Sequence, residues 1–252
     1  MIDYHLHVVA HGDRPMSVEN ILEYCEVAHG RGIRQMGITE HDRYLDEIDL
    51  AAFQEAREKS HYVGLRLGIE IDFVPGAEER MDRDASALPY DYIIGSVHRV
   101  DGDEVDRAGD QRIYDRYETY DLYEAYYANV RKAALSGRFE VLGHPDLIKI
   151  FRRFPDRDIT PMLEETADAV AESGVVIDVN AAGLRKPVGE IYPARDFLEM
   201  FYRRGVPIIL SSDAHAPEEV AMGYEKSLKL VHDVGYREVA TFKDHERGSL
   251  PL

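Results

Sequence analysis

The chain has 252 residues, 44% of them hydrophobic, which suits one α/β barrel or two smaller domains around a sizeable core. Its formal net charge of −18 at pH 7 argues against a nucleic-acid partner, because such partners require a basic patch. No apolar run approaches the ~18 residues of a membrane span, and no signal peptide precedes the first strand. The single cysteine, Cys25, excludes an internal disulfide, and we expect an inert core thiol in a cytoplasmic protein.

Strands and helices are predicted to alternate along the chain. In chain order we expect a strand at 2–6, a helix at 18–31 capped by Ser17, a strand at 35–39, a helix at 50–60, strands at 65–71 and 92–97, a Tyr-rich helix at about 114–136, a strand at 139–142, a helix at 161–173, a strand at 175–179, a helix at 194–204 and a strand at 208–210. One or two closing helices and a polar tail are expected after Pro217.

The predicted strands are mostly continuous apolar runs. Such strands are buried on both faces, which is typical of a parallel sheet covered by helices. Seven strands in 252 residues favour an α/β fold of the distorted (β/α)7 TIM-like barrel type, a single domain over residues 1–252. A Rossmann fold lacks support, because no Gly-x-Gly-x-x-Gly follows any strand.

Metal-binding types of side chain stand at or just after the ends of six of the seven predicted strands. In a parallel barrel these ends meet at one rim, where the active site lies. The nine candidate ligands are His5, His7, His11, His41, Glu70, His98, His144, Asp213 and His215. One histidine at a strand end is more often a hydrogen-bonded structural residue, but seven of the eleven histidines at a single rim indicate a metal centre.

Nine candidates exceed the about four ligands of one tetrahedral zinc ion. The sequence therefore predicts two to three divalent transition metal ions, with Glu70 or Asp213 bridging. Imidazole-rich ligation suits Zn, Fe or Mn better than Mg or Ca, and multi-metal sites serve phosphoryl hydrolysis. Other acids at the rim either orient a histidine or are solvated, namely Glu40, Asp42, Asp72 and Asp146.

Motifs along nearly the whole chain resemble those of the polymerase-and-histidinol-phosphatase (PHP) superfamily. They are DYHLH, GITEHD, GIEIDFVPG, DYIIGSVH, GHPDL, VNAAGLRKPVGEIYP and GVPIILSSDAH, in the family's order. DYIIGSVH and AGLRKPVGEIYP are typical of the histidinol-phosphatase branch. The resemblance implies the PHP fold and three metals, held by His5, His7, Glu70 and Asp213, by Glu70, His98 and His144, and by His11, His41 and His215. The loop between His7 and His11 departs from the family, being shorter and lacking its common Cys-Pro.

The resemblance also implies an activity, that of a phosphomonoesterase acting on a small phosphorylated substrate, L-histidinol phosphate, in histidine biosynthesis. Bound metals would lower the pKa of a bridging water from ~15.7 towards ~7. We assign catalytic roles to Asp213, His215 and Glu70, with Asp213 accepting or relaying the proton.

Cations near the rim are candidates for binding the phosphate. The strand at 175–179 ends in Asn180 and Arg185 without a metal ligand, which leaves rim space for substrate, and the resemblance places a substrate arginine at Arg185. Gly183 would let the backbone approach closely. Arg152 and Lys149 are further candidates.

Three alternatives remain open. One is a PHP hydrolase of another small phosphomonoester or a cyclic phosphodiester. The second is a nuclease of the polymerase-associated type, disfavoured by the acidic charge. The third is a metal-binding module without catalysis, disfavoured by the completeness of the ligand set. The oligomeric state is not indicated.

Overall fold

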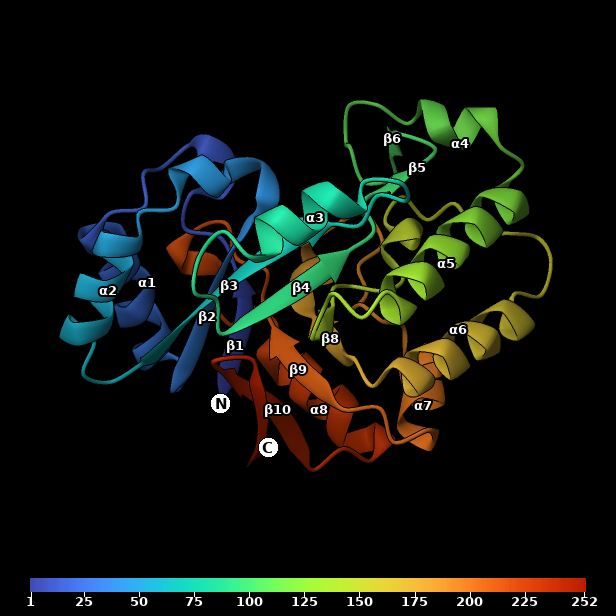
Figure 1. Ribbon diagram of the computed structural model, residues 1–252. Helices are drawn as coiled ribbons and strands as arrows, with labels where there is room; N and C mark the ends of the chain where they lie inside the picture. Colours follow the sequence, from blue (N-terminus) through green and yellow to red (C-terminus); the bar gives the residue numbers. More distant parts are fainter.

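The computed structural model describes residues 1–252 and shows a ring of parallel strands with helices outside it (Figure 1). The seven strands pair in the order β1, β2, β3, β4, β7, β8, β9. Their bounds are β1 Ile2–Leu6, β2 Gln35–His41, β3 Gly64–Asp72, β4 Tyr92–Ser96, β7 Val141–Leu142, β8 Val176–Asn180 and β9 Ile208–Ser211. The predicted distorted (β/α)7 barrel is confirmed.

The first and last strands meet and nearly close the barrel. The backbone N–H of Asp213 donates to the carbonyl of His5, and the N–H of His7 donates to the carbonyl of Ala214, both at 2.8 Å. These bonds lie at the carboxyl end of β1, so they join the two motifs from opposite ends of the chain.

Helices cover the outside of the barrel. Their bounds are α1 Val18–Gly30, α2 Leu50–Lys59, α3 Glu78–Ala85, α4 Arg112–Arg116, α5 Thr119–Leu135, α6 Thr160–Ser173, α7 Arg195–Arg203 and α8 Tyr224–Val234. The predicted cap of α1 is confirmed, since the Ser17 side chain accepts a hydrogen bond from the N–H of Asn20. None of these helices combines the length and hydrophobicity that crossing a membrane requires.

Tyrosines fill the interior near the amino end of the barrel. The ring of Tyr92 stacks on that of Tyr4 with centroids 5.3 Å apart, and its hydroxyl donates to the Tyr4 carbonyl at 2.6 Å. A Cβ on Gly37 would lie 1.8 Å from that hydroxyl, so the neighbouring strand needs glycine there to admit the ring.

The predicted polar tail is wrong, because the chain ends in a β-hairpin of β10 (Glu238–Lys243) and β11 (Glu246–Pro251). Val239, Ala240 and Phe242 of β10 are buried, and Phe242 stacks on Tyr92 with centroids 5.4 Å apart. The hairpin thus packs near the amino end of the barrel.

The segment between β4 and α5 also departs from the prediction. It forms a small hairpin, β5 (Arg99–Val100) and β6 (Asp103–Glu104), followed by α4 (Figure 1, top). The expected single helix at 114–136 is two helices, because Tyr117 is extended between α4 and α5. This segment stands beyond the strand ends that carry the predicted ligands.

Candidate metal centre

All nine predicted ligands lie at the carboxyl rim of the barrel. His5 is on β1 and His7 follows it, His11 lies in the turn Ala10–Gly12, His41 ends β2, Glu70 is near the end of β3, His98 and His144 follow β4 and β7, and Asp213 and His215 follow β9. Strand alternation explains the pairing of His5 with His7, since residues two apart share a face.

Glu70 is the carboxylate around which the histidines gather, and it is 1% exposed. Its Oε2 lies 2.7 Å from Nδ1 of His41, 3.4 Å from Nε2 of His5 and 3.7 Å from Nε2 of His7. Its Oε1 lies 3.1 Å from Nε2 of His144 and 3.6 Å from Nε2 of His98. One carboxylate facing five imidazoles has the arrangement of a bridging ligand.

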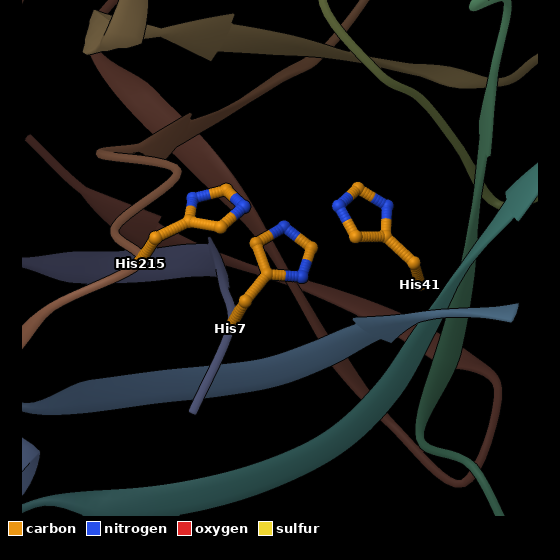
Figure 2. Close-up of side chains that lie close together, drawn as sticks. All are labelled: His7, His41 and His215. Atoms are coloured by element: carbon orange, nitrogen blue, oxygen red, sulfur yellow. The ribbon is translucent and has the colours of Figure 1, made fainter. Parts of the chain in front are cut away.

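Three groups of donor atoms are compact enough to hold an ion, with all atoms of a group within 4.8 Å of one another. The groups are His5, Glu70 and His144; His5, His7 and Asp213; and His7, His41 and His215. Figure 2 shows the last three rings pointing toward one another. The resemblance implied His11 in this third group, but His11 is exposed and lies beside it, with its ring 4.3 Å from that of His215.

The chemistry of these residues fits metal ions. Buried polar atoms here have no hydrogen-bond partner, namely Nε2 of His5, both ring nitrogens of His7 and His41, Nδ1 of His144, Nε2 of His215 and Oε2 of Glu70. Each buried polar group without a partner lowers the stability of the folded protein by roughly 1–3 kcal/mol. A cluster of such groups therefore indicates that a bound partner satisfies them. Divalent cations satisfy neutral imidazoles and carboxylates together.

Hydrogen bonds fix which nitrogen His5 and His98 turn to the centre. Nδ1 of His5 lies 2.9 Å from Oδ2 of Asp178, and Nδ1 of His98 lies 2.6 Å from Oδ1 of Asp72. Such carboxylates set the tautomer and orientation of a ligating imidazole. Asp72 was expected either to orient a histidine or to be solvated, and this contact shows that it orients His98.

The other rim acids have different tasks. Glu40 accepts hydrogen bonds from the N–H groups of Val8 and Val9 at 2.6 and 2.9 Å, which fixes the chain just after His7. Asp42 pairs with Arg80 of α3. Asp146 accepts from the N–H of Ala194 and pairs with Lys149, so it ties two loops together.

Asp178 is a site residue that sequence reasoning missed, because it lies within the apolar strand β8. It is fully buried and binds His5, the Ser211 hydroxyl and the Asn180 amide. The available signal was its spacing of two from Asn180, which places both polar side chains on one face of the strand.

Neighbouring charges shift the pKa values of the rim residues in opposite directions. Burial disfavours the charged forms of His98 and Asp72, but the contact between the two side chains favours those forms. The pKa of His98 is therefore raised to about 10, and the pKa of Asp72 is lowered to about 2. Burial and then the neighbouring His215 and His41 lower the pKa of His11 to about 4. His11 is therefore a neutral imidazole at pH 7, the form that binds metals.

Three rim residues adopt left-handed backbone, His11 with φ 64°, His144 with φ 23° and Asp213 with φ 51°. Such conformations cost a non-glycine residue on the order of 1–3 kcal/mol and cluster at functional sites. Their backbones are held by hydrogen bonds such as that from Asp213 to His5.

A cavity of about 570 Å³ opens over the centre, a volume suited to a small ligand. Its floor includes Glu70, Asp213 and five of the rim histidines. Its walls carry the cations Arg43, Arg107 and Lys186, which the sequence did not single out.

The three predicted phosphate-binding cations lie outside the lining of this cavity. Arg185 donates through Nη2 to the carbonyls of Ser212 and Asp213, both at 3.0 Å, while its buried Nη1 has no partner. Arg152 is exposed. Lys149 is 5% exposed because it pairs with Asp146 at 2.9 Å and donates to the Ile191 carbonyl.

The expected close approach at Gly183 is present, but it is to the chain itself. A Cβ there would lie 1.9 Å from the carbonyl oxygen of Glu190. Glycine at 183 therefore allows the loop after β8 to fold back on itself beside the cavity.

Comparisons with known proteins agree with this geometry. Residues 3–182 match the family described as PHP domain. A probable histidinol-phosphatase of Deinococcus radiodurans is 35% identical over 96% of each chain, and the histidinol-phosphatase of Lactococcus lactis is 25% identical over 96% of this chain and 94% of the relative. A crystal structure of the Lactococcus histidinol phosphate phosphatase with zinc, L-histidinol and phosphate has the same fold, with a TM-score of 0.80 at 20% identity over 98% of each chain.

Proposed function

This chain belongs to the PHP domain family, and from that premise we propose that it is a histidinol-phosphatase, a phosphoric monoester hydrolase that converts L-histidinol phosphate to L-histidinol and phosphate. The observation that carries the proposal is the buried set of histidines around Glu70, open to a cavity of about 570 Å³. The names of the relatives and the ligands of the Lactococcus structure support the same substrate. The reaction is a step of histidine biosynthesis, and we place it in the cytoplasm, in keeping with a single free cysteine.

The proposal includes two to three divalent transition metal ions, Zn, Fe or Mn. The first would be held by His5, His7, Glu70 and Asp213, the second by Glu70, His98 and His144, and the third by His41 and His215 with His11 or His7. Donors compact enough to chelate, with unpartnered buried nitrogens, support the first and third of these sets.

Metal ions bound here would supply a water of lowered pKa and charge stabilisation at the phosphoryl oxygens. The chain's own part begins with Asp213, whose Oδ2 is held by the Asn180 amide at 3.1 Å. That contact fixes the carboxylate so that it can accept a proton at the cavity floor. His215 is held through Nδ1 by the carbonyl of Asp213 at 3.1 Å, which turns its Nε2 toward the centre, so its catalytic role would be to bind metal and not to move a proton.

The phosphate would be bound by cations around the same floor. Arg185 also lies outside the cavity lining and pairs with Glu219 at 3.3 Å, but we retain it as the main candidate because its Nη1 has no partner. Lys186 and Arg43 line the cavity and can offset further charge. Arg152 and Lys149, proposed from their position after His144, have no place in the cavity lining, and Lys149 is already paired.

A substrate panel tests the function. Protein reconstituted separately with Zn, Mn and Fe is assayed for phosphate release from L-histidinol phosphate, other small phosphomonoesters and a cyclic phosphodiester. We expect kcat/KM for L-histidinol phosphate to exceed the others by about two orders of magnitude, or about 2.7 kcal/mol. A higher kcat/KM on a different ester would transfer the proposal to that substrate, and no turnover with any metal would leave a metal-binding module.

A further inference from the structure

The outer wall of the cavity carries a carboxylate that the chemistry described so far does not use. Asp106 lines the cavity together with the metal-centre residues. It follows β6, in the segment between β4 and α5 that stands above the barrel rim (Figure 1).

The residue before Asp106, Val105, is anchored at both its N–H and its carbonyl. The N–H of Val105 donates to the carbonyl of His98 at 2.9 Å, and the Tyr114 hydroxyl donates to the carbonyls of Val105 and Ile148 at 2.7 and 3.1 Å. Val105 is fully buried. Asp106 therefore projects from a fixed point of the cavity wall and not from a loose loop.

Asp106 forms no salt bridge or hydrogen bond, unlike Asp101, Asp103, Glu104 and Asp110 of the same segment, although its charge contributes to the raised pKa of His98. Asp103 pairs with Arg116 at 2.7 Å and Asp110 with Arg112 at 2.6 Å. Glu104 pairs with Arg99 and lies 3.7 Å from Arg107, and Asp101 lies 3.7 Å from Arg116. A lone carboxylate facing a partly enclosed cavity favours a cationic ligand.

A second unmet group lines the same cavity. Tyr192 is 1% exposed, and its hydroxyl has no hydrogen-bond partner. Burial, with contributions from nearby carboxylates, raises the pKa of Tyr192, so its hydroxyl stays a donor at neutral pH. Among the buried tyrosine hydroxyls without a partner, that of Tyr192 is the one on a residue that lines this cavity, so it is a donor available to a polar ligand there.

The cavity therefore carries groups of both charges. The metal-centre residues with the adjoining Lys186 and Arg43 suit a phosphate. The segment between β4 and α5 contributes Glu104 and Arg107, which lie 3.7 Å apart, and Asp106, which forms no salt bridge. A substrate with a phosphate at one end and a positive group a few bonds away matches both.

We propose that Asp106 binds the primary ammonium group of the phosphorylated amino alcohol and so selects substrates that carry one. This rests on the proposed function, since L-histidinol phosphate bears its ammonium on the carbon adjacent to the CH2–O group of the phosphate ester. Asp106 is a specificity-determining residue that holds the substrate by a charge-assisted hydrogen bond, without taking part in bond breaking.

The test compares wild type, Asp106→Asn and the matched control Asp110→Asn, all loaded with zinc. Three substrates are used: L-histidinol phosphate, its analogue lacking the amino group, and 4-nitrophenyl phosphate. We expect Asp106→Asn to lower kcat/KM for L-histidinol phosphate 10- to 100-fold, mainly through KM. For the two substrates without an ammonium the change should stay within twofold, and the control should behave as wild type. Asp106→Lys, which repels the ammonium, should lose more on L-histidinol phosphate.

The outcomes separate the two proposals. If the wild-type protein does not hydrolyse L-histidinol phosphate, both the proposed function and this inference are overturned. An active wild type with Asp106→Asn unchanged, or with equal losses on all three substrates, overturns the role of Asp106 alone. Thermal melting and metal content of each variant identify losses that come from misfolding, and Asp106→Ser then repeats the comparison.

Discussion

The side-chain amide of Asn180 donates a hydrogen bond to Oδ2 of Asp213 at 3.1 Å. The same nitrogen donates to Oδ2 of Asp178 at 3.0 Å, the oxygen that also contacts Nδ1 of His5. The uncharged amide of Asn180 thus lies between two carboxylates and donates one hydrogen bond to each. It leaves Oδ1 of Asp213 free, 3.3 Å from Nε2 of His7.

Replacing Asn180 with Asp should lower kcat/KM by at least 30-fold and reduce bound metal. The change removes both donated hydrogen bonds, each worth about 1.5–3 kcal/mol to a charged acceptor. It also places a third carboxylate between two others. Phosphate release, metal content and thermal melting check this, with Asn129→Asp as the matched substitution away from the rim. Activity within threefold of wild type would contradict the positioning role.

Glu70→Gln and Asp213→Asn should each abolish measurable turnover while the fold persists. Both changes are nearly isosteric, so they remove negative charge from the metal centre without opening a core cavity. The measurements are phosphate release and circular dichroism. Glu47→Gln and Asp46→Asn, at exposed acids outside the cavity lining, are the controls and should retain activity. If either test variant kept a near-wild-type rate, the assignment of that residue to the metal centre would be wrong.

Removal of metal should destabilise the protein and its return should restore it. A ligand at a thousand times its dissociation constant stabilises the native state by about 4 kcal/mol, which corresponds to roughly 8–16 °C in Tm for a chain of this size. Melting curves with a chelator and after zinc is added back measure the shift. Elemental analysis should give more than one metal per chain, and a ratio at or below one after reconstitution would rule out a multi-metal centre.

Arg185→Ala should lower kcat/KM for L-histidinol phosphate by about two orders of magnitude. Its Nη1 is free for a phosphoryl oxygen, while Nη2 supports the carbonyls of Ser212 and Asp213. Arg185→Lys should rescue only partly, because lysine keeps the charge without the two-nitrogen fork. Steady-state kinetics with metal content checked in each variant decide this. If kcat/KM of the Arg185→Ala variant stays within threefold of the wild-type value, the phosphate is bound by Lys186 and Arg43 instead.

Cys25 should react slowly with thiol reagents in the native protein. Burial raises the pKa of this thiol to about 11, so at pH 8 only about one molecule in a thousand is the reactive thiolate. The reaction with a chromogenic disulfide should accelerate about tenfold per pH unit and become fast on denaturation. Cys25→Ala should leave kcat unchanged. A native rate equal to that of a free thiol would show that the helix α1 face is open.

The positions of the ligands could be predicted because strand geometry fixes them. The alternation of side chains placed His5 beside His7, and the shared direction of parallel strands brought the far ends of the chain to one rim. Periodicity therefore predicted the barrel and the rim at which the candidate ligands gather.

The residues around that centre were harder to predict, because no repeating geometry sets them. Asp178 was hidden in an apolar strand, where one buried acid does not change the pattern. The cavity cations Arg43, Arg107 and Lys186 come from loops whose paths depend on contacts such as that of Gly183 with Glu190. The final hairpin was missed since its outer strand is exposed and reads as a polar tail.

The closure of the barrel between β1 and β9 also sets when a metal centre can exist. Two of the three donor groups combine His7 with Asp213 or His215, residues made more than 200 positions apart. A chain emerging from the ribosome carries its first histidines long before their partners are synthesised, and it cannot assemble these groups until the last strand has joined the first. If these groups hold metal as proposed, they can bind it only after the barrel is complete, so a chain truncated before β9 should lose this metal.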